Sequence, residues 1–186
     1  MSAAAQLRKR FTRDDVDHMA KLGLFEGQRL ELLDGDLLEK MGQNPPHADA
    51  IPLLLKLLAG IFDLLRIRIQ SPMEIAVEDR KYNLPEPDLL VRAGHKFVRG
   101  KRHPRGDETI LVIEIADTSL WNDLTIKRDL YARAGVPEYW VLNVKGRKLI
   151  VHRNPKRGAY TATTTLSSRD SVSLSGQSIR VADMLP

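Results

Sequence analysis

The feature that most constrains the fold is an eight-residue apolar run, residues 109–116, that contains one charged side chain, Glu114. Its length and its β-branched residues predict a strand buried on both faces, as in the centre of an α/β sheet. Strand alternation places Glu114 on the same face as Ile110, Val112 and Ala116. A buried ionised carboxylate is costly unless it is paired, hydrogen-bonded or bound to a metal. The alternative is a glutamate at the solvated end of the strand.

A lysine lies on the apolar face of the helix that we expect over residues 124–134. At about 100° per residue, Lys127 falls near the middle of a face formed by Leu124, Ile126, Leu130, Tyr131 and Ala134. A lysine in this position either extends outward to solvent or points at an anion. Asp123, one turn earlier, offers it a simple intrahelical partner.

The remaining patterns predict helices and strands in mixed order. We expect helices at 13–22 and 47–65, a hairpin at 30–38 around Asp34-Gly35, and strands at 66–70, 73–77, 88–91, 139–144 and 148–153. Residues 160–186 are rich in Ser and Thr and predict one or two edge strands. The expected fold class is α/β: a mixed, twisted sheet of about five or more strands flanked by helices, with extra N-terminal and C-terminal strands.

Length and composition limit the domain count and the class of protein. A chain of 186 residues, 42% of them hydrophobic, suits a single domain over residues 1–186, and we expect residues 1–11 to form a flexible N-terminal arm. The chain has no cysteine, which excludes a thiol nucleophile and a Cys-ligated metal. No signal peptide or membrane span is expected, because the most apolar run, residues 51–65, contains Lys56 and Asp63. A cytoplasmic location is the resulting expectation.

A basic segment between residues 92 and 106 contains no acid. Its six cations are predicted to contact nucleic acid: Arg92, Lys96, Arg99, Lys101, Arg102 and Arg105. The formal net charge of +5 permits such an acidic partner. The alternative is a solvated basic loop with no partner.

Two acids and one lysine together predict a metal site. Asp88 begins one predicted strand directly after Pro87, and Glu114 lies near the end of another. Two carboxylates at the ends of neighbouring strands, with Lys127 from the next helix, suit a hard divalent cation, Mg²⁺ or Mn²⁺. A lysine beside such a cation can orient or help deprotonate an attacking water.

The same residues resemble the PD-(D/E)XK nuclease superfamily, which has the restriction-endonuclease-like fold, and more closely the Uma-type restriction endonuclease family. The resemblance covers nearly the whole chain. It is carried by residues 30–36, 87–88, 114–119, and 127 together with 131–140. It implies that Asp88 and Glu114 are metal ligands, with the backbone carbonyl of Ile115 as a third.

The catalytic lysine of the superfamily pattern would stand two residues after the second acid, where this chain has Ala116. Related families carry that lysine on the following helix, so the resemblance assigns the role to Lys127. It also implies that Glu31 is an N-terminal acid close to the metal. The alternative for Glu31 is an exposed hairpin residue.

The expected activity is divalent-metal-dependent hydrolysis of phosphodiester bonds by a DNA endonuclease, acting as a homodimer. One alternative is a non-cleaving nucleic-acid-binding protein of the same fold. Another is a structural or interaction protein in which Glu114 and Lys127 form a buried ion pair. The chain carries no P-loop, HExxH, GxSxG or dinucleotide fingerprint, which disfavours those enzyme classes.

Overall fold

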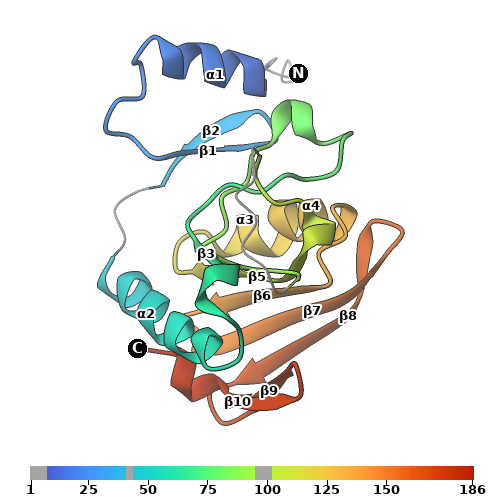
Figure 1. Cartoon of the computed structure of the whole chain (residues 1–186). Coiled ribbons are helices and arrows are strands. Elements are labelled where there is room, and N and C mark those ends of the chain that lie inside the picture. The colour runs from blue at the N-terminus through green and yellow to red at the C-terminus, as the bar shows by residue number, and fades with distance from the viewer. Residues whose placement is uncertain (1–7, 41–43, 95–101) are drawn as a thin grey trace, which may run out of the picture.

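A mixed six-stranded sheet forms the centre of the molecule in the order β3-β4-β5-β6-β7-β8 (Figure 1). The computed structural model describes residues 8–40, 44–94 and 102–186. The strands are β3 Ile67–Ile69, β4 Leu89–Arg92, β5 Thr109–Ala116, β6 Glu138–Asn143, β7 Lys148–Lys156 and β8 Ala159–Ser167. Only β5 and β6 are parallel; the other neighbouring pairs in this sheet are antiparallel. The predicted mixed sheet is confirmed.

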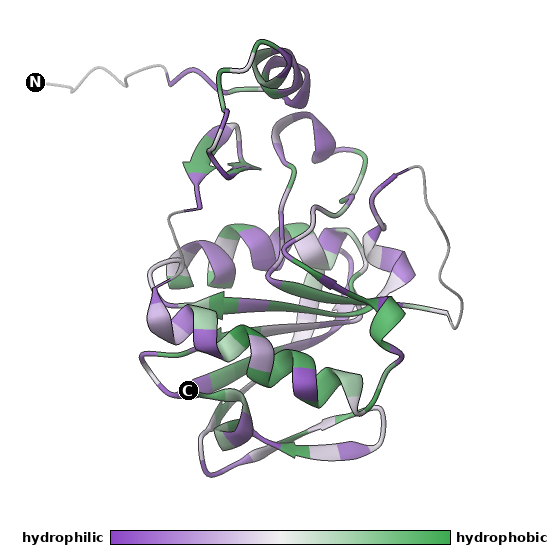
Figure 2. Cartoon of the chain, turned by 60° about the vertical axis from the view of Figure 1, so that its left-hand side comes forward, coloured by the Kyte–Doolittle hydropathy of each residue, from purple (hydrophilic) through white to green (hydrophobic). Residues whose placement is uncertain are grey.

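Strand β5 is central, and its bounds match the apolar run of the sequence. Its side chains alternate between two cores because strand residues point to opposite faces in turn. On one face, Leu111, Ile113 and Ile115 pack with α2, Pro45–Ala59. Figure 2 shows α2 lying along the sheet with hydrophobic residues over much of its length. The opposite face of β5 therefore has to be covered by a different element.

That element is a composite helix rather than the single helix predicted over residues 124–134. It consists of α3 Leu120–Asn122, a π-helical turn η4 Asp123–Lys127, and α4 Arg128–Arg133. The start was predicted four residues too late, because the backbone amide of Asp123 already bonds to the carbonyl of Ser119 at 3.1 Å. A π-helical turn has no simple side-chain signature, so the sequence could not show it.

An N-terminal unit lies above the sheet (Figure 1). Helix α1, Arg13–Lys21, begins with a capping box formed by Thr12 and Asp15. The predicted hairpin is formed by β1 Leu30–Leu33 and β2 Asp36–Glu39. Its turn residues have positive φ, 49° for Asp34 and 82° for Gly35, as a tight two-residue hairpin turn requires.

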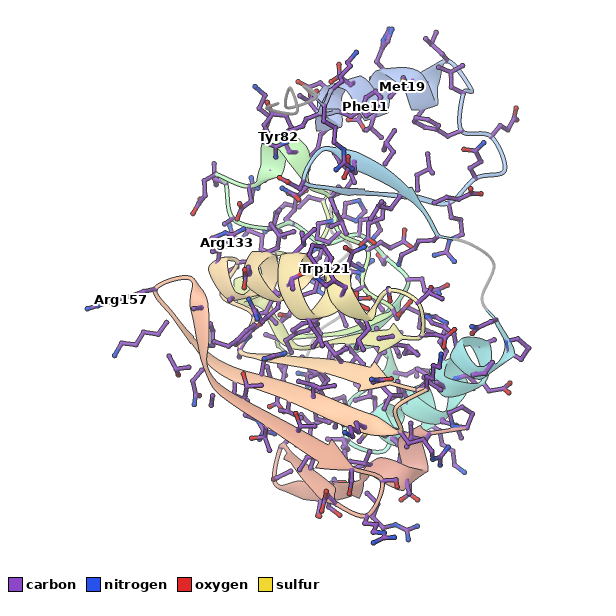
Figure 3. All side chains as sticks on the ribbon, turned by 180° about the vertical axis from the view of Figure 1, so that it is seen from behind. Phe11, Met19, Tyr82, Trp121, Arg133 and Arg157 are labelled. Carbon is purple, nitrogen blue, oxygen red and sulfur yellow. The ribbon has the colours of Figure 1, made fainter. Side chains whose placement is uncertain are left out.

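The expected N-terminal arm is held against this hairpin over its described part, residues 8–11; residues 1–7 lie outside the described residues. The amide of Phe11 donates to the carbonyl of Gly35 at 2.8 Å, and Arg8 forms an ion pair with Asp36. The Arg10 guanidinium stacks on Tyr82, 4.0 Å from the ring centre. Figure 3 shows Phe11 and Tyr82 at this end of the molecule.

Two other elements differ from the sequence prediction. Helix α2 ends at Ala59 instead of residue 65, because the chain turns at Gly60 and continues as a 3₁₀ turn, Leu64–Arg66. Residues 73–77 form no strand, and Glu74 makes only an isolated bridge to Arg105. The predicted strand there fails because Met73 and Ile75 are buried in two separate apolar clusters without a ladder partner.

The C-terminal segment contains more strands than predicted. Strand β8 forms one edge of the main sheet, and β9 Ser171–Leu174 pairs with β10 Gln177–Arg180 in a separate hairpin. Val172, Leu174 and Ile179 of that hairpin are buried in the same core as α2. Each strand of this hairpin has only four residues, so its alternation of polar and apolar side chains is too short to give a strong strand signal. No helix among the described residues is long and apolar enough to span a membrane.

Candidate functional site

A pocket of about 490 Å³ opens where β4 begins and β5 ends. The β1–β2 hairpin, the first turn of α2 and the composite helix complete its walls. Its charged and titratable lining consists of Arg29, Glu31, Glu39, Lys40, His47, Asp88, Glu114, Asp117, Asp123 and Lys127. The structure therefore brings Glu31, Asp88, Glu114 and Lys127, which are far apart in the sequence, to one place.

Asp88 and Glu114 lie on the same side of the sheet. Strands β4 and β5 pair with Leu89 opposite Ile113, so continuing the register by one residue sets Asp88 opposite Glu114. Opposed residues of an antiparallel pair point to the same face. Both acids line the pocket. Two carboxylates can share one cation only if their side chains point to the same side of the sheet, and these two do.

Asp88 is a buried, firmly held carboxylate. Its Oδ2 accepts a hydrogen bond from the backbone amide of Ile115 at 2.8 Å and lies 3.2 Å from Nε2 of His47. Burial acts to raise the pKa of Asp88, but the hydrogen bond from His47 and the positive charge of Lys40 outweigh it and lower the pKa to about 2. Asp88 is therefore ionised at neutral pH.

Lys127 lies at the centre of the acid cluster, with a side chain that is 4% exposed. Its Nζ is 3.0 Å from Oε1 of Glu31, 3.1 Å from Oε1 of Glu114 and 3.6 Å from Oδ1 of Asp123. Burial acts to lower the pKa of Lys127, but the negative charges of Glu114, Glu31 and Asp123 raise it well above its ordinary value. The ammonium form is thus the stable one at neutral pH.

Glu114 is buried on the face predicted from strand alternation. Its Oε1 also accepts a hydrogen bond from the Tyr131 hydroxyl at 2.8 Å. Burial raises the pKa of Glu114 well above its ordinary value, and Asp123 and Asp88 add to this effect against the opposing charge of Lys127. Burial also raises the pKa of Asp123. The acids of the pocket carry more negative charge than its buried lysine can neutralise.

The donor chemistry of this pocket fits a hard divalent cation. Carboxylate oxygens are what Mg²⁺ and Mn²⁺ prefer, and the surplus negative charge favours a cation. Asp123 Oδ1 and His47 Nδ1 are buried atoms that have no hydrogen-bond partner within the described ranges. No group of three Asp, Glu or His side chains in the described part of the chain is arranged to hold a metal alone. Asp88 and Glu114 would therefore have to share the cation with waters or substrate phosphate, as Mg²⁺ sites commonly do.

Glu31 is buried and is not an exposed hairpin residue. Besides its ion pair with Lys127, it accepts a hydrogen bond from the Glu86 amide at 2.8 Å. Ile115 donates its own amide to Asp88, while its side chain packs in the core on the α2 side.

The basic segment is described only in part, since Lys96, Arg99 and Lys101 lie outside the described residues. Arg102 donates to both carboxylate oxygens of Glu108, at 2.8 and 2.7 Å. Arg105 forms ion pairs with Asp107 and Glu108. These two acids follow directly after the acid-free segment. They partly neutralise the cations at its C-terminal end, which the composition of the segment alone did not indicate. Arg92, at the end of β4, accepts a hydrogen bond at its carbonyl from Arg66.

Comparisons with known proteins identify the family of this chain. The family described as "Putative restriction endonuclease", Uma2, matches residues 14–181. The chain belongs to the Uma2 family. This membership supports a nuclease-like, hydrolytic function and places the chain among restriction-endonuclease-like proteins.

A solved structure shares the fold of this Uma2 chain. It is a crystal structure described as a putative nuclease belonging to DUF820 from Anabaena variabilis ATCC 29413. The two superpose with a TM-score of 0.64 at 14% sequence identity, over 83% of this chain and 88% of the other. At this identity the likeness shows the fold, and it confirms the predicted restriction-endonuclease-like class. A comparison with curated proteins found no match.

The Uma2 pocket also contains residues that the sequence prediction missed. His47 contacts Asp88, and Asn44 donates a side-chain hydrogen bond to Asp117. The signal was present in the sequence, because Asn44 caps α2 ahead of two prolines and so places His47 in the first helical turn. What the sequence could not show is that this helix end faces the pocket.

Trp121 is a further residue beside the Uma2 pocket that sequence analysis did not single out. It belongs to α3 and is 68% exposed, on the face of the molecule seen in Figure 3. Its neighbour Asn122 lines the pocket.

Proposed function

We propose that this Uma2 protein is a divalent-cation-dependent endonuclease that hydrolyses phosphodiester bonds in DNA, with Mg²⁺ or Mn²⁺ as its cofactor. One observation supports the proposal above the others: Asp88, Glu114 and Lys127 line one pocket, with Lys127 Nζ 3.1 Å from Glu114 Oε1. Two acids and an ammonium beside a space for substrate are suited to phosphoryl chemistry, in which catalysis is mainly positioning and charge stabilisation.

Asp88 and Glu114 would hold the cation, and the Ile115 carbonyl is the proposed third protein ligand. When bound, a divalent cation stabilises negative charge on the phosphate and lowers the pKa of a coordinated water. Asp88 is available as an ionised ligand because His47, Lys40 and the Ile115 amide lower its pKa.

Lys127 is assigned a positioning and charge-stabilising role. Because its pKa is raised, its Nζ is protonated at neutral pH and can donate to the attacking water or to a phosphate oxygen. Glu31 and Tyr131 complete the arrangement: Glu31 holds the ammonium at 3.0 Å, and the Tyr131 hydroxyl holds Glu114. We therefore assign Lys127 the orientation of water rather than removal of its proton.

The nucleic-acid partner and the oligomeric state form part of the same proposal. The acid-free basic segment is proposed to contact the DNA backbone through Arg92, Lys96, Arg99, Lys101, Arg102 and Arg105. Nucleases that cut both strands of a duplex commonly pair two sites, so by analogy with them we propose a homodimer acting in the cytoplasm. Sedimentation with and without duplex DNA measures the stoichiometry.

Cleavage of supercoiled plasmid by purified protein tests the activity. We expect nicking and linearisation with Mg²⁺ or Mn²⁺ and none with EDTA. Asp88→Asn and Glu114→Gln each remove one ligand charge at nearly constant volume and should abolish cleavage. Asp17→Asn removes an exposed acid from α1 and serves as the control, with wild-type cleavage expected.

DNA binding measured on the same variants separates cutting from binding. Asp88→Asn should keep wild-type affinity for duplex DNA in EDTA, because Asp88 is buried and the substitution removes none of the cations proposed to contact the backbone. Wild-type protein that binds DNA but cuts none under any divalent cation would contradict the nuclease proposal and leave a non-cleaving binder.

A second candidate function is a structural or interaction protein, and one observation favours it. Lys127 is buried with three acids within 3.6 Å, which is also the arrangement of a purely structural ion cluster. Such a protein would bind neither Mn²⁺ nor DNA, and Glu114→Gln would change its stability alone. Calorimetric titration with Mn²⁺ decides between the two candidates.

A further inference from the structure

His47 occupies a defined position beside Asp88. It lies in the first turn of α2, where the side chain of Asn44 accepts a hydrogen bond from its backbone amide at 3.1 Å. Helix α2 is anchored in the core through Ala50, Leu54 and Leu58. The imidazole is therefore placed by the packed body of the protein, and its Nε2 lies 3.2 Å from Asp88 Oδ2.

The contact with Asp88 fixes which nitrogen of His47 carries a proton. A carboxylate oxygen only accepts hydrogen bonds, so Nε2 has to be the donor. In the neutral ring, Nδ1 is then a bare acceptor, and it is buried without a hydrogen-bond partner among the described residues. A histidine that served packing alone would be expected to have both nitrogens satisfied or solvated.

Both donors to Asp88 meet the same oxygen. The Ile115 amide of β5 and Nε2 of His47 both contact Oδ2, at 2.8 and 3.2 Å. Rotation of the carboxyl group about its bond to Cβ would break both contacts, so the two donors together hold one orientation. Oδ1 accepts no hydrogen bond from the described residues and is the oxygen left for a ligand.

We propose that His47 is a positioning residue that orients the Asp88 carboxylate, through Nε2–H and Oδ2, so that Oδ1 is presented to a divalent cation. This inference rests on the proposed metal-dependent function and adds to it a residue outside the predicted acid–lysine set. Mutation of a residue that orients a metal ligand commonly lowers metal affinity by about 10–100-fold.

Binding of Mn²⁺ alone, measured by calorimetry and by electron paramagnetic resonance, tests the role without any cleavage assay. We expect His47→Ala to weaken Mn²⁺ affinity by about 10–100-fold. His47→Gln should recover most of the affinity, because its amide nitrogen can stand where Nε2 stands. His47→Asn should not, because its shorter side chain places the amide nitrogen at the Nδ1 position.

A matched control and a stability measurement exclude a merely structural role. His18→Ala removes an exposed histidine from α1 and should leave Mn²⁺ affinity unchanged. Melting temperatures in EDTA show whether each variant is folded. If His47→Ala does not fold, the comparison of His47→Gln with His47→Asn carries the test, since both keep a polar amide in the site.

The outcomes separate this inference from the function on which it rests. Wild-type protein that binds Mn²⁺ while His47→Ala binds it equally well would overturn the role of His47 alone. If His47→Gln and His47→Asn weaken Mn²⁺ affinity equally, the claim that a donor at the Nε2 position orients Asp88 is wrong. Wild-type protein that binds no Mn²⁺ would overturn the metal-dependent function, and the inference with it.

Discussion

At the residue scale, the pKa values of both Lys127 and Glu114 are raised, which is not what an isolated ion pair produces. A single pair raises the lysine and lowers the acid. Here burial raises the pKa of Glu114, and the like charges of Asp123 and Asp88 add to that effect against the single charge of Lys127. Lys127 is shared by Glu31, Glu114 and Asp123, and these three acids raise its pKa in spite of its own burial. The site is therefore short of positive charge, which a second cation would supply.

Lys127→Met should lower both stability and cleavage. Removing the ammonium leaves three buried acids without their shared partner, a change that costs about 3–5 kcal/mol for a broken buried ion pair. Cleavage should fall by roughly a hundredfold or more, the scale for loss of a positioned charge stabiliser. Thermal melts and Mn²⁺-supported cleavage on one preparation measure the two effects. A variant that cuts at the wild-type rate would remove Lys127 from the reaction.

Glu114→Gln should raise stability at neutral pH while abolishing cleavage. The folded-state pKa of Glu114 lies above its ordinary value of 4.5, so folded protein binds this proton more tightly than unfolded protein does. The contribution of Glu114 to the free energy of unfolding of the wild type therefore falls as pH rises from about 4.5 through the folded-state pKa. Glutamine does not titrate, so the variant does not show this decrease. The free energy of unfolding of the glutamine variant should exceed that of the wild type at pH 7, by an amount that shrinks towards pH 4. Melting curves across this range measure it, and a pH-independent difference would contradict the raised pKa.

At the element scale, the β1–β2 hairpin is what delivers Glu31 to the pocket. Its turn carries Gly35 at a φ of 82°, and a Cβ added there would lie 2.5 Å from Cβ of Arg10. The hairpin and the residue 8–11 segment therefore fit together only with glycine at this position.

Gly35→Ala should loosen the hairpin and reduce cleavage through Glu31. The control is Gly27→Ala, because Gly27 has a similar φ of 77° but open space around its Cα. Both substitutions cost about 1 kcal/mol through backbone strain, and only Gly35→Ala adds the clash. Hydrogen exchange of residues 30–39 should rise in Gly35→Ala alone. Equal exchange in the two variants would show that the contact with Arg10 is unimportant.

At the scale of the whole molecule, a net charge of +5 coexists with an acid-rich pocket. Cations placed outside the pocket can draw in a polyanion while the acids keep a divalent cation at its centre. The described end of the basic segment is internally paired through Glu108, so its contribution should be smaller than that of the preceding residues.

Replacing Arg99, Lys101 and Arg102 together with Ala should weaken DNA affinity at all sequences and flatten its dependence on salt. Each lost phosphate contact reduces the slope by about 0.9 in a log–log plot. Arg102→Ala alone should change the slope less, because its guanidinium is already bonded to Glu108. Titrations between low and moderate salt measure both variants. A slope unchanged in the triple variant would exclude this segment from the interface.

Local patterns predicted much of this molecule. Residues 109–116 gave the bounds of β5, and the 100° helical phase put Lys127 on the buried face although the helix starts earlier and contains a π-helical turn. The sequence did not predict which segments come together in space. That α2 would face the pocket with His47, or that Glu108 would pair with Arg102, depends on contacts between segments with no common sequence pattern.

The pocket draws its acids and lysine from chain segments that leave the ribosome at different times. Glu31 emerges first and Lys127 almost a hundred residues later, and β5 gains its parallel partner β6 only after residue 143. Long-range parallel pairing forms late in folding, because distant segments have to meet first. A nascent chain therefore holds its acids apart and carries no assembled centre. The proposed cleavage would therefore have to wait until nearly the whole pocket-forming part of the chain has been synthesised.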